Sequence, residues 1–349
     1  MADPRAIGPA RERGAALLTV LLLVAVMAVI TAVALERLTL ATRMAQNGIG
    51  TDQGRAFLLA GEAVATLRLA DLVNARAGRT TLAGGWLGTP QAIAVPGGRV
   101  TARVRDAGNC FNVNSLVSGG TATATASTGA TTTDGAATAS LTFTTRPAGV
   151  SQFAALLRLL GTDPGVAEQI AAASADWIDS DAVPGPGGAE DSFYQQRPVP
   201  YRTAGGLLAD PSEIRVVSGM TAPIYDRLRP WLCALPVAEL SPININTLLP
   251  DQAILLAMLT DGRLGPDAAR QVLARRPQDG YGSLVTFWGQ PALAGLGISS
   301  DVSEQAKLTS GWFEVELRAD VAGTDVTETA LFDARNMPVR LVRRRWGDE

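Results

Sequence analysis

A short acidic stretch is the strongest candidate for chemistry in this sequence. Residues 176–191 read DWIDSDAVPGPGGAED, and no basic residue accompanies the five acids, which are Asp176, Asp179, Asp181, Glu190 and Asp191. Three glycines and two prolines separate the two acidic ends, so the loop can fold back on itself. Clustered carboxylates suit Ca²⁺, which takes roughly six to eight oxygen ligands, although the spacing is not that of an EF-hand. A solvated acidic loop and a glycosidase-type carboxylate pair are the alternatives.

The composition excludes most other kinds of site. The 349 residues include no histidine, which rules out Ser-His-Asp and Cys-His nucleophile pairs, HExxH zinc sites and histidine-ligated haem. Two cysteines, Cys110 and Cys233, are too few for a four-thiolate zinc site or an iron–sulfur cluster. A net charge of −3 is atypical of a dedicated nucleic-acid binder. We therefore expect neither an enzyme nor a nucleic-acid partner.

The N-terminal segment decides which compartment holds the acidic loop. Residues 15–35 are 21 uncharged positions, long enough to span a bilayer core, and the leader 1–14 before them carries three arginines. By the positive-inside rule the leader stays in the cytoplasm and the body is exported. This predicts a single-pass inner-membrane protein with a periplasmic body.

Three interpretations of this segment are open. It is a signal peptide cleaved near Ala32-Val33-Ala34, a plain anchor, or a pilin-like segment cleaved between Gly14 and Ala15. The apolar run is longer than a signal-peptide core, and residues 36–79 continue without proline as an amphipathic helix, which favours the third. Thr19 then occupies the fifth position of the cleaved chain, where pilin-like helices usually carry glutamate.

The rest of the chain predicts an α+β protein in which strands bracket helices. Alternating apolar residues around Gly97-Gly98 indicate a hairpin, and a strand pattern returns after Gly311. Between them, Asp163-Pro164 has the form of a helix start. The expected units are 1–14 leader, 15–80 helix, 81–117 first strands, 118–150 low-complexity loop, 151–310 all-helical insertion (units 151–236 and 243–310) and 311–349 second strands. A threonine-rich edge strand is the alternative for the loop.

Two further features link these units. FNVNSL at 111–116 is echoed by ININTL at 243–248, and both are expected where the insertion meets the strands. Closure of a strand end by polar residues is the simpler alternative.

In a periplasmic body Cys110 and Cys233 can form a disulfide between the strand layer and the insertion. Two buried thiols are the alternative.

Several stretches together resemble the minor pseudopilin K family of type II secretion systems. They are the RG-AALLTVLLLVAVM start with Thr19 in place of Glu, FNVNSL, WIDSD…GAEDSFYQQRPVPYRTA from Trp177 to Ala204, LRPWLCALP, and ININT. The resemblance covers nearly the whole chain. It implies a pilin-like transmembrane helix and a small antiparallel sheet that is interrupted by a large all-α insertion domain.

The resemblance also implies a processing site, a metal and partners. Prepilin peptidase would cleave after Gly14 and methylate Ala15. Calcium would be bound by Asp179, Asp181, Glu190 and Asp191, together with Asp176. The partners would be the minor pseudopilins I and J, and the subunit would cap the pseudopilus and initiate its assembly. The subunit would also contact secreted substrates and the outer-membrane channel.

A type IV pilus minor pilin or a DNA-uptake receptor is the alternative function. Residues 243–276 resemble a helix-hairpin-helix module, a fold that binds the DNA backbone. The usual Gly-hydrophobic-Gly turn is replaced by Asp261-Gly262-Arg263-Leu264-Gly265. Four arginines supply the positive charge of this region: Arg263, Arg270, Arg275 and Arg276.

Overall fold

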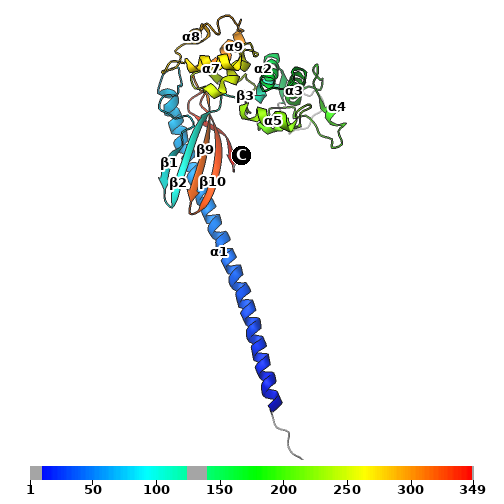
Figure 1. Ribbon diagram of the computed structural model, residues 1–349, viewed down its shortest axis with the longest axis vertical. Coiled ribbons are helices and arrows are strands. Elements are labelled where there is room, and N and C mark those ends of the chain that lie inside the picture. Colours follow the sequence, from blue (N-terminus) through cyan, green and yellow to red (C-terminus); the bar gives the residue numbers. More distant parts are fainter. Residues whose placement is uncertain (1–9, 124–139, 348–349) are drawn as a thin grey trace, which may run out of the picture.

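One long helix dominates the shape of the protein. The computed structural model describes residues 10–123 and 140–347, and Figure 1 shows a head carried on helix α1 (Ala10–Asn74). The prediction of one unbroken helix is confirmed, but α1 begins before Ala15 and ends before residue 80. Gly78, with a φ of 73°, lies just beyond its end in a backbone conformation that helices do not continue.

The first half of α1 stands clear of the head. Every residue from Ala15 to Ile49 is exposed, and Gly50 is the first buried position of the helix. The apolar part is long enough to cross a membrane. At 1.5 Å per residue the exposed part measures roughly 50 Å, so it can cross the bilayer core and still project beyond it.

A five-stranded antiparallel sheet forms the part of the head nearest to this helix. Its order is β1-β2-β9-β10-β11, with β1 Gln91–Val95, β2 Gly98–Asp106, β9 Trp312–Val321, β10 Thr324–Asp333 and β11 Arg340–Trp346. The predicted hairpin is β1–β2, in which Gly98 is required because a Cβ there would lie 1.8 Å from the Asp320 carbonyl oxygen. Strands β2 and β9 pair directly, so the two predicted strand regions form one sheet.

The second half of α1 packs on this sheet. Leu58 and Leu69 are buried together with Val315 and Leu317, which alternate along β9. Gly54 lets the helix approach closely, because a Cβ there would lie 3.0 Å from a methyl group of Val326. The sheet and the second half of α1 therefore share one core.

An ion pair also joins α1 to the far strands of the sheet. Arg344 on β11 contacts both Glu62 oxygens on α1 at 2.5 Å and Glu328 on β10 at 3.4 Å. Burial and the neighbouring Glu62 raise the pKa of Glu328 to about 8. Glu328 therefore holds a proton more readily than Glu62, whose pKa is lowered by Arg344 and which is the anion of the pair.

The chain between β2 and β9 folds into helices with a separate core. Its α-helices are α2 Pro147–Leu159, α3 Pro164–Ile178, α4 Asp191–Tyr194, α5 Ala222–Leu228, α6 Ala253–Leu259, α7 Pro266–Ala274, α8 Leu284–Trp288 and α9 Ser300–Gln305. The 3₁₀ turns are η1 Val113–Leu116, η2 Pro211–Val216, η3 Arg229–Trp231 and η4 Pro250–Gln252. The short strands are β3 Phe111–Asn112, β4 Val117–Thr123, β5 Ser140–Thr145, β6 Leu232–Cys233, β7 Ile243–Asn244 and β8 Ala306–Lys307. Asp163 caps α3 as predicted.

The two asparagine motifs have matching roles in this helical part. After β3, Asn114 donates to the Leu208 carbonyl oxygen and accepts from the Leu208 amide. After β7, Asn246 does the same with the carbonyl and amide of Tyr281. Each side chain thereby holds a distant loop by its backbone. The echo in the sequence reflects a repeated structural device.

The boundary predicted at residue 117 is wrong. Strand β2 ends at Asp106. Phe111, Val113 and Leu116 are buried in the helical core, and the Phe111 ring stacks on the Phe153 ring with their centroids 4.8 Å apart. The local pattern does not predict this boundary because the boundary depends on a tertiary contact. Strand β3 lies outside the five-stranded sheet and pairs in parallel with β6. Residues 111–117 therefore belong to the insertion.

The interpretation of 118–150 as a loop is also wrong for the residues that the structure describes. Strands β4 and β5 form an antiparallel hairpin, and α2 starts at Pro147. Buried Val117 and Phe143 anchor the hairpin to the helical core despite the Thr/Ala/Gly composition. Residues 124–139 of the predicted loop lie outside the described part.

Candidate metal centre

Three of the predicted ligands lie together at the end of α3. Asp179 follows the last turn of α3, Asp181 lies two residues on, and Glu190 is the N-cap residue of α4. One carboxylate oxygen from each lies within 4.8 Å of the others. The intervening glycines and prolines turn the chain back, so the two acidic ends of the loop converge as the sequence predicted.

Asp179, Asp181 and Glu190 form the acidic cluster, and its two buried members, Asp179 and Glu190, each have one carboxylate oxygen without a hydrogen-bond partner. Asp179 and Glu190 are only 3% and 2% exposed, and Asp179 Oδ1 and Glu190 Oε1 accept no hydrogen bond. Burial, together with the charges of Asp179 and Asp176, raises the pKa of Glu190 to about 7. Two buried oxygens aimed into a cluster of like charge are satisfied best by a cation.

Asp176 supports the loop and lies at the border of the cluster. Its carboxylate accepts from the Gly185 amide at 3.1 and 3.2 Å. Gly188 passes so close that a Cβ there would lie 1.9 Å from Asp176 Oδ2. Burial raises the pKa of Asp176, and Asp181 adds to the shift. Asp176 therefore fixes the curl of the loop, with its charge close to the other acids.

Asp191 does not join the cluster. Its Oδ1 accepts from the Thr203 amide at 2.8 Å and from the Thr203 hydroxyl at 3.0 Å, and Arg202 lies 4.0 Å from Oδ2. These contacts lower the pKa of Asp191, the Thr203 amide most strongly. Glu190 and Asp191 are adjacent in sequence but make contacts in different directions, because α4 begins between them.

No pattern in the sequence indicates the contacts that join the cluster to the hairpin. Thr145 at the end of β5 donates to Asp179 Oδ2 at 2.7 Å, which leaves Oδ1 directed at the cluster. Ser180 accepts from the Phe143 amide through its hydroxyl and donates its own amide to the Phe143 carbonyl. Both partners lie in the low-complexity stretch, whose composition does not predict such contacts.

The donor set fits calcium. All three side chains of the cluster offer hard carboxylate oxygens, which Ca²⁺ prefers and which softer transition metals do not select. Carboxylates from three residues leave positions for backbone carbonyls and water. Asp179, Asp181 and Glu190 are thus the residues that would hold the ion, with Asp176 adding negative charge beside it.

The other predicted sites are a disulfide and a processing site. Cys110 and Cys233 are joined by a disulfide, with Cα atoms 5.8 Å apart, beside the parallel pair of β3 and β6. This bond joins the segment that follows β2 to strand β6. Gly14 and Ala15, the predicted processing positions, lie inside α1.

The region that resembles a helix-hairpin-helix uses its arginines internally. Arg276 donates to the Ile245 and Leu248 carbonyl oxygens, and Arg263 to that of Thr260. Arg270 is paired with Asp267 at 2.6 Å. Three of its four arginines therefore stabilise the local fold, which weighs against a DNA-binding surface.

A membrane-length helix that packs on a small antiparallel sheet defines the class of pilin-like subunits, enlarged here by the helical insertion. Two models of type II secretion system protein K match the chain, one over residues 109–237 and one over 243–309. The chain belongs to the protein K family of the type II secretion system.

Individual relatives agree with this assignment over most of the chain. The chain is 35% identical to the type II secretion system protein K of Pectobacterium carotovorum over 97% of both chains. Against the Klebsiella pneumoniae protein it is 35% identical, covering 81% of each. A chain in the crystal structure of the GspK-GspI-GspJ complex from enterotoxigenic Escherichia coli superposes with a TM-score of 0.68 at 30% identity, covering 85% of this chain and 97% of that one.

Proposed function

We propose that this protein is the tip subunit of a pseudopilus, which caps the filament and initiates its assembly. One observation carries the proposal: the helical part lies over the end of the sheet that is farthest from the membrane segment (Figure 1). In a filament built from parallel α1 helices, this is where the next subunit would stack. A subunit with this bulk at its outer end fits the last position only.

Thr19 supports the same position in the filament. A glutamate at the fifth position of a cleaved helix would be buried in the helix bundle, where it needs the N-terminal ammonium of a neighbour. The Thr19 hydroxyl instead donates to the Ala16 carbonyl of its own helix at 2.9 Å. Thr19 therefore requires no charged partner, as expected for a subunit with no neighbour above it.

The partners of the proposed tip are the minor pseudopilins I and J. A structural relative of this chain was crystallised as a GspK-GspI-GspJ complex, which supports these partners for this chain as well. The exposed apolar face of α1 is suited to lateral packing with two similar helices in the inner membrane. The head would then project toward the outer-membrane channel and the secreted substrates.

The leader and the disulfide support the proposed orientation in the membrane. A positively charged leader keeps the N-terminus in the cytoplasm, and a disulfide between Cys110 and Cys233 persists in an oxidising periplasm. Prepilin peptidase would cleave on the cytoplasmic side, between Gly14 and Ala15, and methylate the new N-terminus. Calcium in the acidic cluster would serve as a structural ion that fixes the loop between α3 and α4.

The processing can be tested on protein extracted from membranes. Intact-mass and peptide mass spectrometry should show a chain that starts at Ala15 and carries one added methyl group. Protein from cells without prepilin peptidase should retain residues 1–14 and lack the methyl group. A chain starting at Leu35 in cells with the peptidase would indicate signal-peptide cleavage and refute the filament role.

A further inference from the structure

A fully buried carboxyl group lies between α1 and the sheet, outside the acidic cluster. Glu328 of β10 is 0% exposed, and neither of its side-chain oxygens accepts a hydrogen bond from a described residue. It stands opposite Leu317 of β9 in the ladder, so its side chain is on the face of the sheet that packs against α1. An ionised carboxylate at this position would have lost the donors that water supplies in the unfolded chain.

Arg344 of β11 is the cation next to this carboxyl group, and it is already bound to a second one. Its Nε and Nη2 atoms lie 2.5 Å from the two carboxylate oxygens of Glu62 on α1, whereas Nε lies 3.4 Å from Glu328 Oε1. Glu62 is itself buried, with 7% of its surface exposed. If both carboxyl groups were ionised, one guanidinium would face two buried negative charges, and one of these would be left without compensation.

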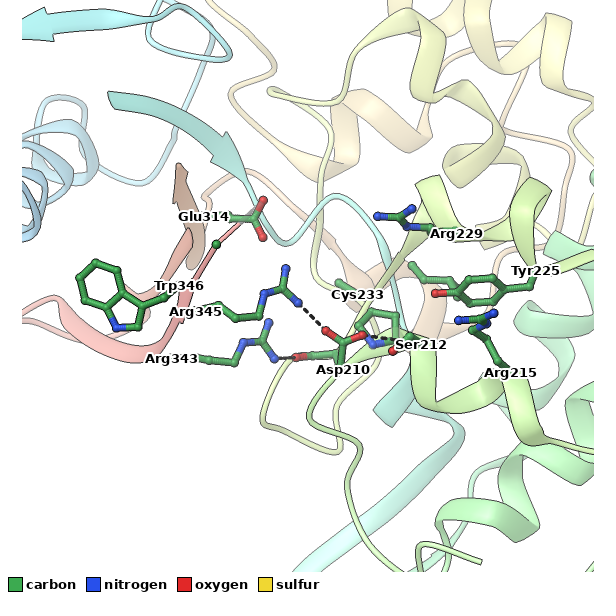
Figure 2. A pocket seen from close by; sticks show the side chains of 14 residues that line it. Asp210, Ser212, Arg215, Tyr225, Arg229, Cys233, Glu314, Arg343, Arg345 and Trp346 are labelled. Atoms are coloured by element: carbon green, nitrogen blue, oxygen red, sulfur yellow. Dashed lines mark hydrogen bonds and ion pairs between the residues drawn. The ribbon is translucent and has the colours of Figure 1, made fainter. Parts of the chain in front are cut away.

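The other arginines of β11 do not supply the missing charge. Arg343 and Arg345 flank Arg344, and side chains alternate along a strand, so these two point to the opposite face of the sheet. Figure 2 shows them extending toward Asp210, beside a cavity of about 450 Å³. Arg345 is paired with Asp210 at 2.5 Å, and Arg343 donates to the Ala234 carbonyl oxygen at 3.1 Å. Of these three arginines, Arg344 alone faces α1.

Arg55 of α1 is the other charged side chain beside this pair, and it contacts an aromatic ring. Its guanidinium lies 5.6 Å from the ring centre of Trp346, the residue opposite Glu328 on β11. The neighbours of Glu328 on the same face of β9 and β10 are apolar: Val315, Leu317, Ala319, Val326 and Ala330. Within the described part of the chain, Arg344 is therefore the cation that the two carboxyl groups share.

These surroundings make the two carboxyl groups unequal. Burial, followed by the hydrogen bond and the charge of Glu62, raises the pKa of Glu328 to about 8. Burial acts on Glu62 in the same direction, but hydrogen bonds from Arg344 and Glu328 and the charge of Arg344 lower its pKa overall. The proton of the pair is therefore carried by Glu328, which donates it toward Glu62.

We propose that this proton is a latch between the membrane helix and the head: α1 is docked firmly while Glu328 and Glu62 share it, and the docking loosens when alkaline pH removes it. The latch lies in the contact that holds the head on α1. It makes the rigidity of that contact depend on the pH of the surrounding solution. The latch rests neither on the tip role nor on the metal.

The direction of the effect follows from the protons bound in the two states. Undocking exposes Glu328 to water, where its pKa returns toward the ordinary glutamate value of about 4.5. Between this value and about 8 the docked state binds more protons, so docking weakens as the pH rises, by at most about tenfold per pH unit. Above about 8 the effect levels off. Glu62 has a lowered pKa, so it is ionised in both states above about pH 6 and adds nothing there.

Hydrogen exchange of the full-length protein in detergent micelles tests the latch at two pH values, about 6 and about 9. After correction for the intrinsic exchange rate, the protection of residues 54–69 of α1 should fall by at least about tenfold at the higher pH. Helix α6, which lies in the separate helical core, is the internal reference and should change by less than about twofold.

Variants assign the effect to the pair. Glu328→Gln keeps the shape of the side chain and cannot lose a proton, so the protection of residues 54–69 should change by less than about twofold between the two pH values. Glu62→Gln frees Arg344 for Glu328, which should then be ionised at both pH values, with an equally small change. Glu304→Gln, at an exposed position on α9, should retain the response of the natural sequence. Two independent variants keep the test open if one of them lowers overall stability.

Infrared difference spectra between the same two pH values detect the proton itself. A band of a protonated carboxyl group should disappear at the higher pH, and Glu328→Gln should lack that part of the signal. No loss of α1 protection in the natural sequence, or an equal loss in Glu328→Gln, would overturn the proposal. A loss of protection shared by α6 would indicate general alkaline unfolding and would overturn it as well.

Discussion

Removal of calcium from the full-length protein should lower the melting temperature by about 5–15 °C. An ion bound only to the native state at 100 to 1,000 times its Kd stabilises by about 2.7–4.1 kcal/mol, and a domain of this size shifts by roughly 2–4 °C per kcal/mol. The stabilisation arises because Asp179 Oδ1 and Glu190 Oε1 are buried without a hydrogen-bond donor. The measurement is thermal unfolding followed by circular dichroism, in EGTA and in millimolar calcium.

Three variants locate this effect. Asp179→Ala should abolish the response to calcium, since it removes a ligand of the cluster. Asp191→Ala should retain the response, because Asp191 is bound to Thr203 outside the cluster. Asp226→Ala, an exposed position on α5, controls for the loss of one negative charge. An identical melting temperature with and without calcium, or a response that depends on Asp191 instead of Asp179, would refute the site.

Replacement of a motif asparagine should cost about 3–5 kcal/mol of unfolding free energy. Asn114→Ala would remove hydrogen bonds to Leu208 and Leu235 and leave their backbone groups buried without partners. Asn246→Ala would do the same to Tyr281. Each unsatisfied group adds a desolvation penalty that water cannot relieve. Urea denaturation of the full-length protein in micelles measures both effects.

An exposed asparagine provides the matched control. Asn336→Ala, in the turn before β11, should change the unfolding free energy by less than about 0.5 kcal/mol. If the two motif variants differ from this control by less than about 1 kcal/mol, the asparagines do not anchor the loops. The repeat in the sequence would then have no energetic meaning.

The features that the sequence predicted depend on local patterns. An uncharged run of 21 residues predicts α1, and the alternation of Phe313, Val315 and Leu317 predicts β9. The Asp163-Pro164 start of α3 also needs only neighbouring residues. The convergence of the two acidic ends of the loop could be predicted for the same reason, because glycine and proline content indicates where a chain can turn.

The features that could not be predicted from the sequence depend on contacts between distant residues. Thr145 and Asp179 meet only after the hairpin has docked, and nothing near Thr145 in the sequence indicates this. Glu190 and Asp191 differ only in which way each side chain points at the start of α4. Arg345 and Asp210 form an ion pair although they lie 135 positions apart in the sequence. Composition and spacing do not encode such pairings.

The central claim, a place at the pseudopilus tip, is tested most directly by counting and locating the subunit. Val285 on α8 is 83% exposed, and Cys110 and Cys233 are engaged in a disulfide, so Val285→Cys offers one free thiol for a gold label. Labelled pseudopili examined by electron microscopy should carry a single gold particle at one end. Gold particles repeated along the length of the filament would contradict the account.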